Sequence, residues 1–114
     1  MTKKDLSQLY YLRREIEDDR RRLARLEDRN GLSIAAQAEM ADLRAIIQAK
    51  NEMCVARYNQ IMRYVAGIED SMMRQIIIFR HADMMTWREI AQRIGGGNTE
   101  DSIRKAYARF LEQE

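Results

Sequence analysis

The first quarter of the chain alternates apolar and charged positions with the period of an α-helix. Its apolar residues recur at spacings of three, four and seven, which are the a and d positions of a coiled-coil heptad. They are Leu9, Leu12, Ile16, Leu23 and Leu26, and Asp19 interrupts the series at one d position. Most other positions are charged, so the pattern predicts an amphipathic helix over residues 4–29.

A second apolar stripe continues through residues 34–66. It repeats at a strict interval of seven at Met40, Ile47, Cys54, Ile61 and Ile68, and is widened by Leu43, Ile46, Met53, Tyr58, Met62 and Val65. Between the stripes, Asn30–Gly31 predicts a helix C-cap and Ser33 an N-cap. The two segments therefore predict a long, coiled-coil-like helical hairpin. Two helices cannot bury a two-sided stripe, so we expect a homodimer formed through residues 5–66.

The remaining segment, residues 68–114, predicts three shorter helices. Asp70 is the N-cap of the first, whose core face holds Met72 or Met73 together with Ile76 and Ile77. Thr86 and Glu89 have the spacing of a capping box, and the inner face of that helix is Ile90, Ala91 and Ile94. After three adjacent glycines, Asn98 or Thr99 caps a last helix lined by Ile103, Ala106, Tyr107, Phe110 and Leu111.

The breaks between these segments are made by glycine alone. The chain has no proline, and its glycines stand at Gly31, Gly67 and Gly95–Gly97, where a positive φ can end a helix or turn a corner. Alternation with a period of two is nowhere sustained. We therefore expect an all-α fold with a hairpin domain over 1–67 and a helix-turn-helix domain over 68–114.

Composition adds the expected cellular compartment. The single cysteine, Cys54, allows no intramolecular disulfide, and the first residues contain no apolar core of a signal peptide. The longest strongly apolar run, residues 76–79, is far too short to span a membrane. These features predict a soluble, cytoplasmic protein without a membrane partner.

Two short helices joined by a glycine turn, after a supporting helix, have the form of a helix-turn-helix. The stretch DSMMRQIIIFRHADMMTWREIAQRIGGGNTEDSIRKAYARFL, residues 70–112, resembles region 4 of the sigma-70 transcription factors. It is more similar still to small sigma-like regulators of phages and prophages, the RinA/ArpU-type activators and related phage proteins. In them a charged coiled-coil region precedes the helix-turn-helix. The GGGN turn is longer than in the usual sigma form.

The resemblance implies a set of residues that contact double-stranded DNA. In sigma-like readers these residues flank the buried aliphatic residue of the last helix, here Ile103. They are Thr99, Asp101, Ser102, Arg104, Lys105 and Arg109. Arg104 or Lys105 would read guanine, Asp101 would accept from cytosine, and Thr99 would hold a phosphate at the helix N-terminus. The alternative is that the acidic residues complement the helix dipole and the basic ones form a solvated face.

Charge limits how tightly one such module can bind. The net charge is +2, but residues 68–114 carry 7 Lys or Arg and 8 Asp or Glu, a balance of −1. Each contact between a cationic side chain and a phosphate releases counterions from DNA, and this release favours binding. A module with few such contacts therefore binds DNA weakly. Two copies held together, or docking of the hairpin on RNA polymerase, would compensate.

No arrangement of residues suggests catalysis, a metal or a cofactor. The sequence contains no catalytic triad pattern, phosphate loop or metal-ligand cluster, His81 is expected at the surface or at a helix end, and Trp87 is expected to anchor the hinge between helices. We therefore expect a non-enzymatic transcription regulator that binds DNA. The alternative is an assembly or interaction protein, either a packaging adaptor similar to small terminases or a helical adaptor that binds polymerase.

Overall fold

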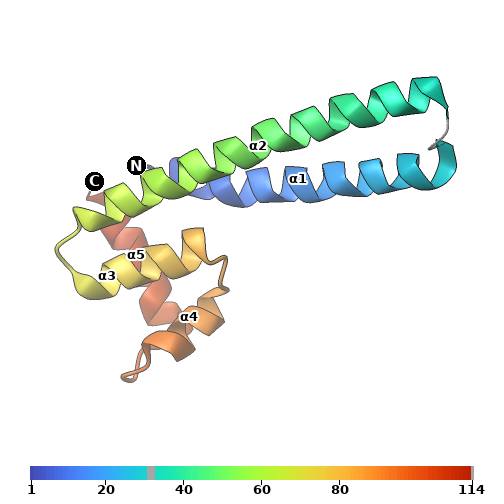
Figure 1. Cartoon of the computed structure of the whole chain (residues 1–114). Helices are drawn as coiled ribbons and strands as arrows, with labels where there is room; N and C mark the ends of the chain where they lie inside the picture. The colour runs from blue at the N-terminus through green and yellow to red at the C-terminus, as the bar shows by residue number, and fades with distance from the viewer. Residues whose placement is uncertain (31–32, 114) are drawn as a thin grey trace. The chain divides into compact units, whose positions relative to one another are not determined.

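The computed structural model describes residues 1–30 and 33–113, without the side chain of Asn30. Within these ranges every regular element is helical, which confirms the all-α class (Figure 1). The elements are α1 (Lys3–Asn30), α2 (Ile34–Ala66), α3 (Ser71–Ile77), the π-helical turn η1 (Ile78–Ala82), α4 (Trp87–Ile94) and α5 (Glu100–Glu112). No described helix combines the length and the apolar character needed to cross a membrane.

The two long helices lie side by side and antiparallel as the predicted hairpin (Figure 1). Their facing heptad positions form the seam, where the buried residues include Leu12, Ile16, Met40 and Ile47. The predicted N-cap is present, since the Ser33 hydroxyl accepts the Ala36 N–H at 3.4 Å. The predicted C-cap at Asn30–Gly31 lies outside the described residues.

The chain divides into two compact units whose border crosses both long helices. We call Tyr11–Ala56 the hairpin unit, and Met1–Tyr10 with Arg57–Glu114 the basal unit. The first turns of α1 and the last turns of α2 therefore pack together with α3, α4 and α5. The fully buried side chains of this basal core are Leu6, Leu9, Ile61, Ile76, Ile77, Ile90 and Ile103.

The start of α3 is fixed by its side-chain cap, as predicted. The Asp70 carboxylate accepts the Met72 N–H at 3.1 Å. Arg74 then donates to the backbone carbonyls of Ile68 and Glu69 at 2.6 and 2.9 Å, which holds the link from α2 in place. This link contains Gly67, which does not adopt the positive φ that glycine allows.

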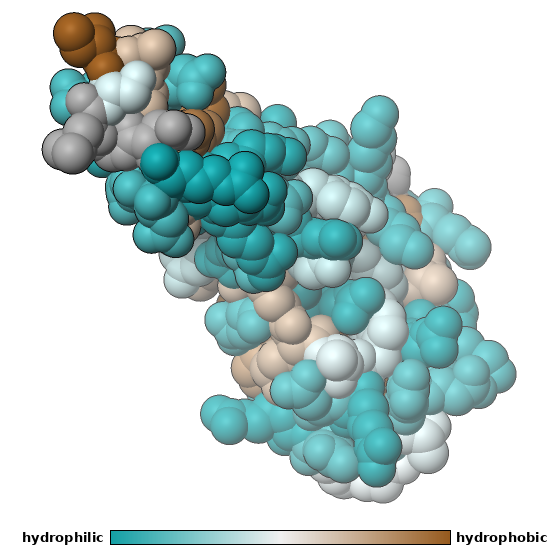
Figure 2. Space-filling view, turned by 90° about the vertical axis from the view of Figure 1, so that its right-hand side faces the viewer, coloured by the Kyte–Doolittle hydropathy of each residue, from teal (hydrophilic) through white to brown (hydrophobic). Residues whose placement is uncertain are grey.

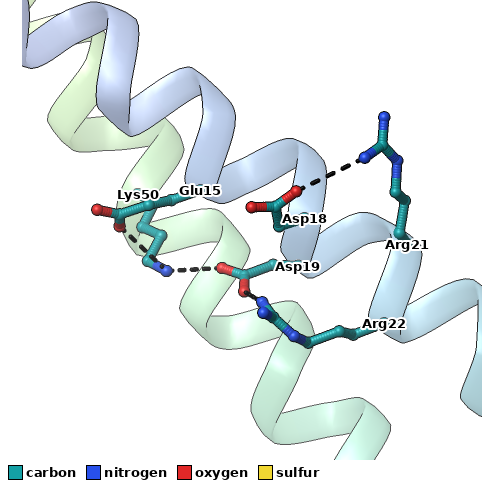
Figure 3. Close-up of polar contacts among 6 residues, drawn as sticks. All are labelled: Glu15, Asp18, Asp19, Arg21, Arg22 and Lys50. Atoms are coloured by element: carbon teal, nitrogen blue, oxygen red, sulfur yellow. Dashed lines mark hydrogen bonds and ion pairs between the residues drawn. The ribbon is translucent and has the colours of Figure 1, made fainter.

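In the hairpin unit, the polar heptad position Asp19 is buried rather than solvated. Figure 3 shows its polar contacts. Its carboxylate accepts from Lys50 Nζ at 2.6 Å and from Arg22 Nη1 at 2.9 Å, and Lys50 also reaches Glu15 at 3.3 Å. The hydrogen bond from Lys50 holds the pKa of Asp19 below its usual value, although burial acts in the opposite direction. The same bond raises the pKa of Lys50. An ion pair therefore replaces one apolar layer of the seam.

Candidate nucleic-acid interface

The turn before α5 explains the three adjacent glycines. Gly95, Gly96 and Gly97 have φ values of 67°, 63° and 79°, a left-handed conformation that strains any residue with a Cβ. A Cβ on Gly97 would meet no atom within 4 Å, so backbone conformation and not space requires glycine there. Asn98 closes the turn, because its side-chain amide donates to the Gly95 carbonyl at 2.8 Å.

The N-terminus of α5 is closed by a reciprocal capping box. Thr99 Oγ1 accepts the Ser102 N–H at 3.1 Å, and Ser102 Oγ accepts the Thr99 N–H at 2.9 Å. Of the two predicted caps, the structure therefore selects Thr99. Both hydroxyls are engaged in the cap. The first-turn amides of Glu100 and Asp101 have no acceptor within the helix, as at the start of any α-helix.

The apolar face of α5 is anchored in the core of the basal unit. Ile103 is fully buried and Tyr107 is nearly so. The Trp87 ring lies edge-on to Tyr107 with centroids 4.9 Å apart, and the Arg80 guanidinium stands 4.6 Å from the Trp87 ring centroid. Trp87 thus packs between η1 and α5, in the hinge position expected for it. This anchoring fixes which side of α5 faces outward.

Of the two places expected for His81, the structure shows the helix end, in the last turn of η1, and not the surface. The side chain is only 6% exposed, and its Nε2 lies 2.7 Å from the Tyr107 hydroxyl. Burial, reinforced by the charges of Arg80 and Lys3, lowers the pKa of His81 to about 4, so the ring is neutral at pH 7. Burial also raises the pKa of Tyr107 to about 12. His81 joins η1 to α5, and the described residues contain no group of three potential metal ligands.

The six predicted DNA-contacting residues are all exposed on α5 or at its N-cap. Two surface ion pairs connect successive turns there: Lys105 with Asp101 at 2.9 Å, and Arg104 with Glu100 at 3.7 Å. The hydrogen bond from Lys105 lowers the pKa of Asp101, which therefore stays an acceptor. Pairs this exposed open at little cost, so the cations remain accessible to a ligand.

A groove of about 900 Å³ is lined by three of these six residues. They are Asp101, Arg104 and Lys105, and Lys3 and Trp87 line it with them. Thr99, Ser102 and Arg109 do not line it, and by helical spacing Ser102 and Arg109 lie on a neighbouring side of α5. The structure therefore brings Lys3 beside the predicted face, a neighbour that the sequence pattern did not reveal.

Sequence reasoning also left out two arginines of α4. Arg88 and Arg93 are exposed, and Arg93 lies 5.7 Å from the Phe79 ring centroid. In helix-turn-helix proteins the first helix crosses the nucleic-acid backbone, where such residues contact phosphates. Their spacing resembles that of any solvated helix face, so no signal in the sequence singled them out.

The chain was compared with protein-family models, with curated proteins and with solved structures. No family model, no curated protein and no solved structure matches the chain. The interpretation of the site therefore depends on α4, the glycine turn and the exposed face of α5.

Proposed function

We propose that this protein is a small, non-enzymatic regulator of transcription, of the phage type, that inserts α5 into the major groove of double-stranded DNA. The observation that carries the proposal is the asymmetry of α5. Its apolar side is anchored through Ile103 and Tyr107, while all six polar residues implied by the sigma-like resemblance are exposed. A helix presented in this way is what groove insertion requires.

The N-terminus of α5 supports a phosphate contact. The free amides of Glu100 and Asp101 and the positive end of the helix dipole attract an anion. The hydroxyls of Thr99 and Ser102 are already engaged in the capping box. In this proposal a phosphate is therefore held by the backbone, and Thr99 contributes by fixing the geometry of the first turn.

Base contacts fall to the cations one turn further along. Arg104 and Lys105 would exchange their acidic partners on α5 for the acceptor atoms of guanine, and a released Asp101 could accept from cytosine. Arg109 extends the cationic side toward the phosphate backbone. Since residues 68–114 have a balance of −1, one module binds weakly. We propose a homodimer through residues 5–66, with RNA polymerase as a further partner.

A binding assay on selected and random duplexes at two salt concentrations tests this proposal. Replacing Arg104 and Lys105 by Ala should weaken binding to the selected site by about thirtyfold or more, because two good base contacts of about 1–3 kcal/mol each sum to about 2–6 kcal/mol. The matched control replaces two exposed arginines of the hairpin unit, Arg20 and Arg21, by Ala, which removes the same charge outside the basal unit that contains α5. Equal losses in both variants would contradict α5 as the reading helix.

The near-neutral charge of the C-terminal region also favours a second candidate, an assembly or interaction protein. Here α5 would be a scaffold, and the ion pairs at Arg104 and Lys105 would stabilise its surface. The protein would then be a packaging adaptor of the small-terminase kind or a helical adaptor for polymerase. Ring-shaped oligomers with no preference for the selected duplex would support this reading over transcription regulation.

A further inference from the structure

The hairpin unit carries a groove to which both long helices contribute one face. Each helix supplies four residues at spacings i, i+3, i+4 and i+7, and the groove measures about 530 Å³. From α1 come Arg22, Arg25, Leu26 and Arg29, and from α2 come Glu39, Asp42, Leu43 and Ile46. The apolar residues of the groove are Leu26, Leu43 and Ile46. We call its charged residues on α1 (Arg22, Arg25 and Arg29) the basic bank, and those on α2 (Glu39 and Asp42) the acidic bank.

The two banks have opposite sign, and most of their charges are unpaired. Arg25 and Arg29 on α1 form no ion pair in the described part of the chain, and neither do Glu39 and Asp42 on α2. Only Arg22 is occupied, by Asp19 at the end of the network drawn in Figure 3. Four charges on one groove thus remain available to a partner of complementary pattern.

Apolar residues continue along the same face beyond the groove. Ile46 is 46% exposed, and Met53, seven residues further on α2, is 50% exposed. Tyr11, which by helical spacing shares the face of Arg22 on α1, is 55% exposed. The face drawn in Figure 2 is mostly hydrophilic, with apolar areas between the polar side chains. An exposed apolar seam bordered by unpaired charges is typical of an interface.

We infer that this face binds a second copy of the chain, in a parallel two-fold dimer. When the symmetry axis runs along the hairpin, α1 of each copy lies over α2 of the other at the same level. Arg25 and Arg29 of the basic bank then face the partner's acidic bank, and the second contact repeats the first by symmetry. All four unpaired charges are matched, while Leu26, Leu43 and Ile46 are covered.

The antiparallel alternative fails on the same charges. With the axis across the hairpin at the groove, α1 lies over α1 and α2 over α2, which places basic residues against basic and acidic against acidic. Like charges placed opposite one another are destabilising. The charge pattern of the groove therefore selects the orientation as well as the occupant.

This inference adds an orientation to the homodimer of the proposed function, and its biological meaning rests on that proposed function. Both α1 and α2 continue from the hairpin unit into the basal unit. In a parallel dimer both hairpins run in the same direction, and two copies of α5 are held in one molecule for adjacent half-sites. The interface itself requires no DNA, so its test is independent of DNA binding.

Analytical ultracentrifugation of the full chain without DNA tests the interface. Replacing Arg25 by Glu should raise the dimer dissociation constant at least tenfold, because each substitution acts at two symmetric contacts. The matched control, Arg20→Glu, makes the same change on α1 outside the groove and should leave the constant unchanged. Exchanging both banks, with Arg25→Glu, Arg29→Glu, Glu39→Lys and Asp42→Lys together, should restore the dimer. A monomeric wild-type chain, or equal effects of Arg25→Glu and Arg20→Glu, would overturn the inference.

Cross-linking tests the orientation separately. In a Cys54→Ser background, one chain carries Arg25→Cys and a second, tagged chain carries Asp42→Cys. A short bis-maleimide should join residue 25 of one chain to residue 42 of the other. Predominant 25-to-25 and 42-to-42 products would overturn the parallel arrangement. Circular dichroism checks that each variant remains helical. A failure of the proposed DNA binding would change neither the dimer dissociation constant nor the cross-linked products, so the two proposals can fail separately.

Discussion

His81 Nε2 and the Tyr107 hydroxyl lie 2.7 Å apart in the interior of the basal unit, joining η1 to the helix proposed to read DNA. Removing the hydroxyl should leave the imidazole nitrogen without its partner. Tyr107→Phe is expected to lower the free energy of unfolding by about 1–3 kcal/mol, the cost of an unsatisfied buried polar group. Urea denaturation measures this change in the free energy of unfolding. The control is Tyr58→Phe at an exposed tyrosine, which should change the stability by far less.

The lowered pKa of His81 predicts an acid-sensitive fold. The pKa rises from about 4 in the folded chain to its ordinary value of 6.5 on unfolding. The unfolded chain therefore binds more protons below pH 6.5, and stability falls as the pH drops from 6.5 to 4. The contribution of His81 to this loss is up to about 3 kcal/mol, at about 1.4 kcal/mol for each pKa unit. His81→Gln should remove this part of the pH dependence, and an unchanged slope would show that the ring is not held neutral.

Lys50 and Asp19 give a contrast between breaking a buried pair and replacing it. Lys50→Met leaves a carboxylate whose side chain is only 8% exposed with Arg22 as its remaining cation, and should destabilise the chain by about 2–4 kcal/mol. Replacing both partners, with Asp19→Leu and Lys50→Met together, restores the apolar heptad instead and should be neutral or stabilising. Thermal denaturation of both variants tests the ordering. A Lys50→Met variant as stable as wild type would show that Asp19 does not depend on Lys50.

The left-handed turn predicts a difference between two glycines. Gly96→Ala places a Cβ on a residue with φ of 63° and should cost about 1–2 kcal/mol. Gly67→Ala meets only an ordinary contact, 3.5 Å from the Tyr64 carbonyl oxygen, at a backbone without positive φ. That variant should change stability by less than about 1 kcal/mol, in either direction. Similar losses at both sites would remove the conformational explanation of the triple glycine.

Features that depend on neighbouring residues could be predicted from the sequence. The caps at Ser33, Asp70, Thr86 and Thr99 and the turn at Gly95–Gly97 all act within a few residues, where residue type indicates geometry. The long helices followed from heptad spacing for the same reason. The exposed side of α5 also followed, because the buried positions on one face determine the other.

Contacts between distant residues could not be predicted. His81 and Tyr107 are 26 residues apart, and Asp19 and Lys50 are 31 apart. A lone histidine or a heptad interruption has no pattern that names its partner. The charged banks of the hairpin groove are ordinary solvated positions until α1 and α2 are placed side by side. The π-helical turn η1 likewise left no sequence signal.

DNA binding by the polar side of α5 can be followed residue by residue in solution. An isotope-labelled chain is titrated with a selected duplex, and its amide NMR shifts are recorded. We expect the largest changes at residues 99–105 and at Arg109, with little change at the buried Ile90. Shifts confined to the hairpin unit, with α5 unaffected at saturating duplex, would show that α5 does not bind DNA.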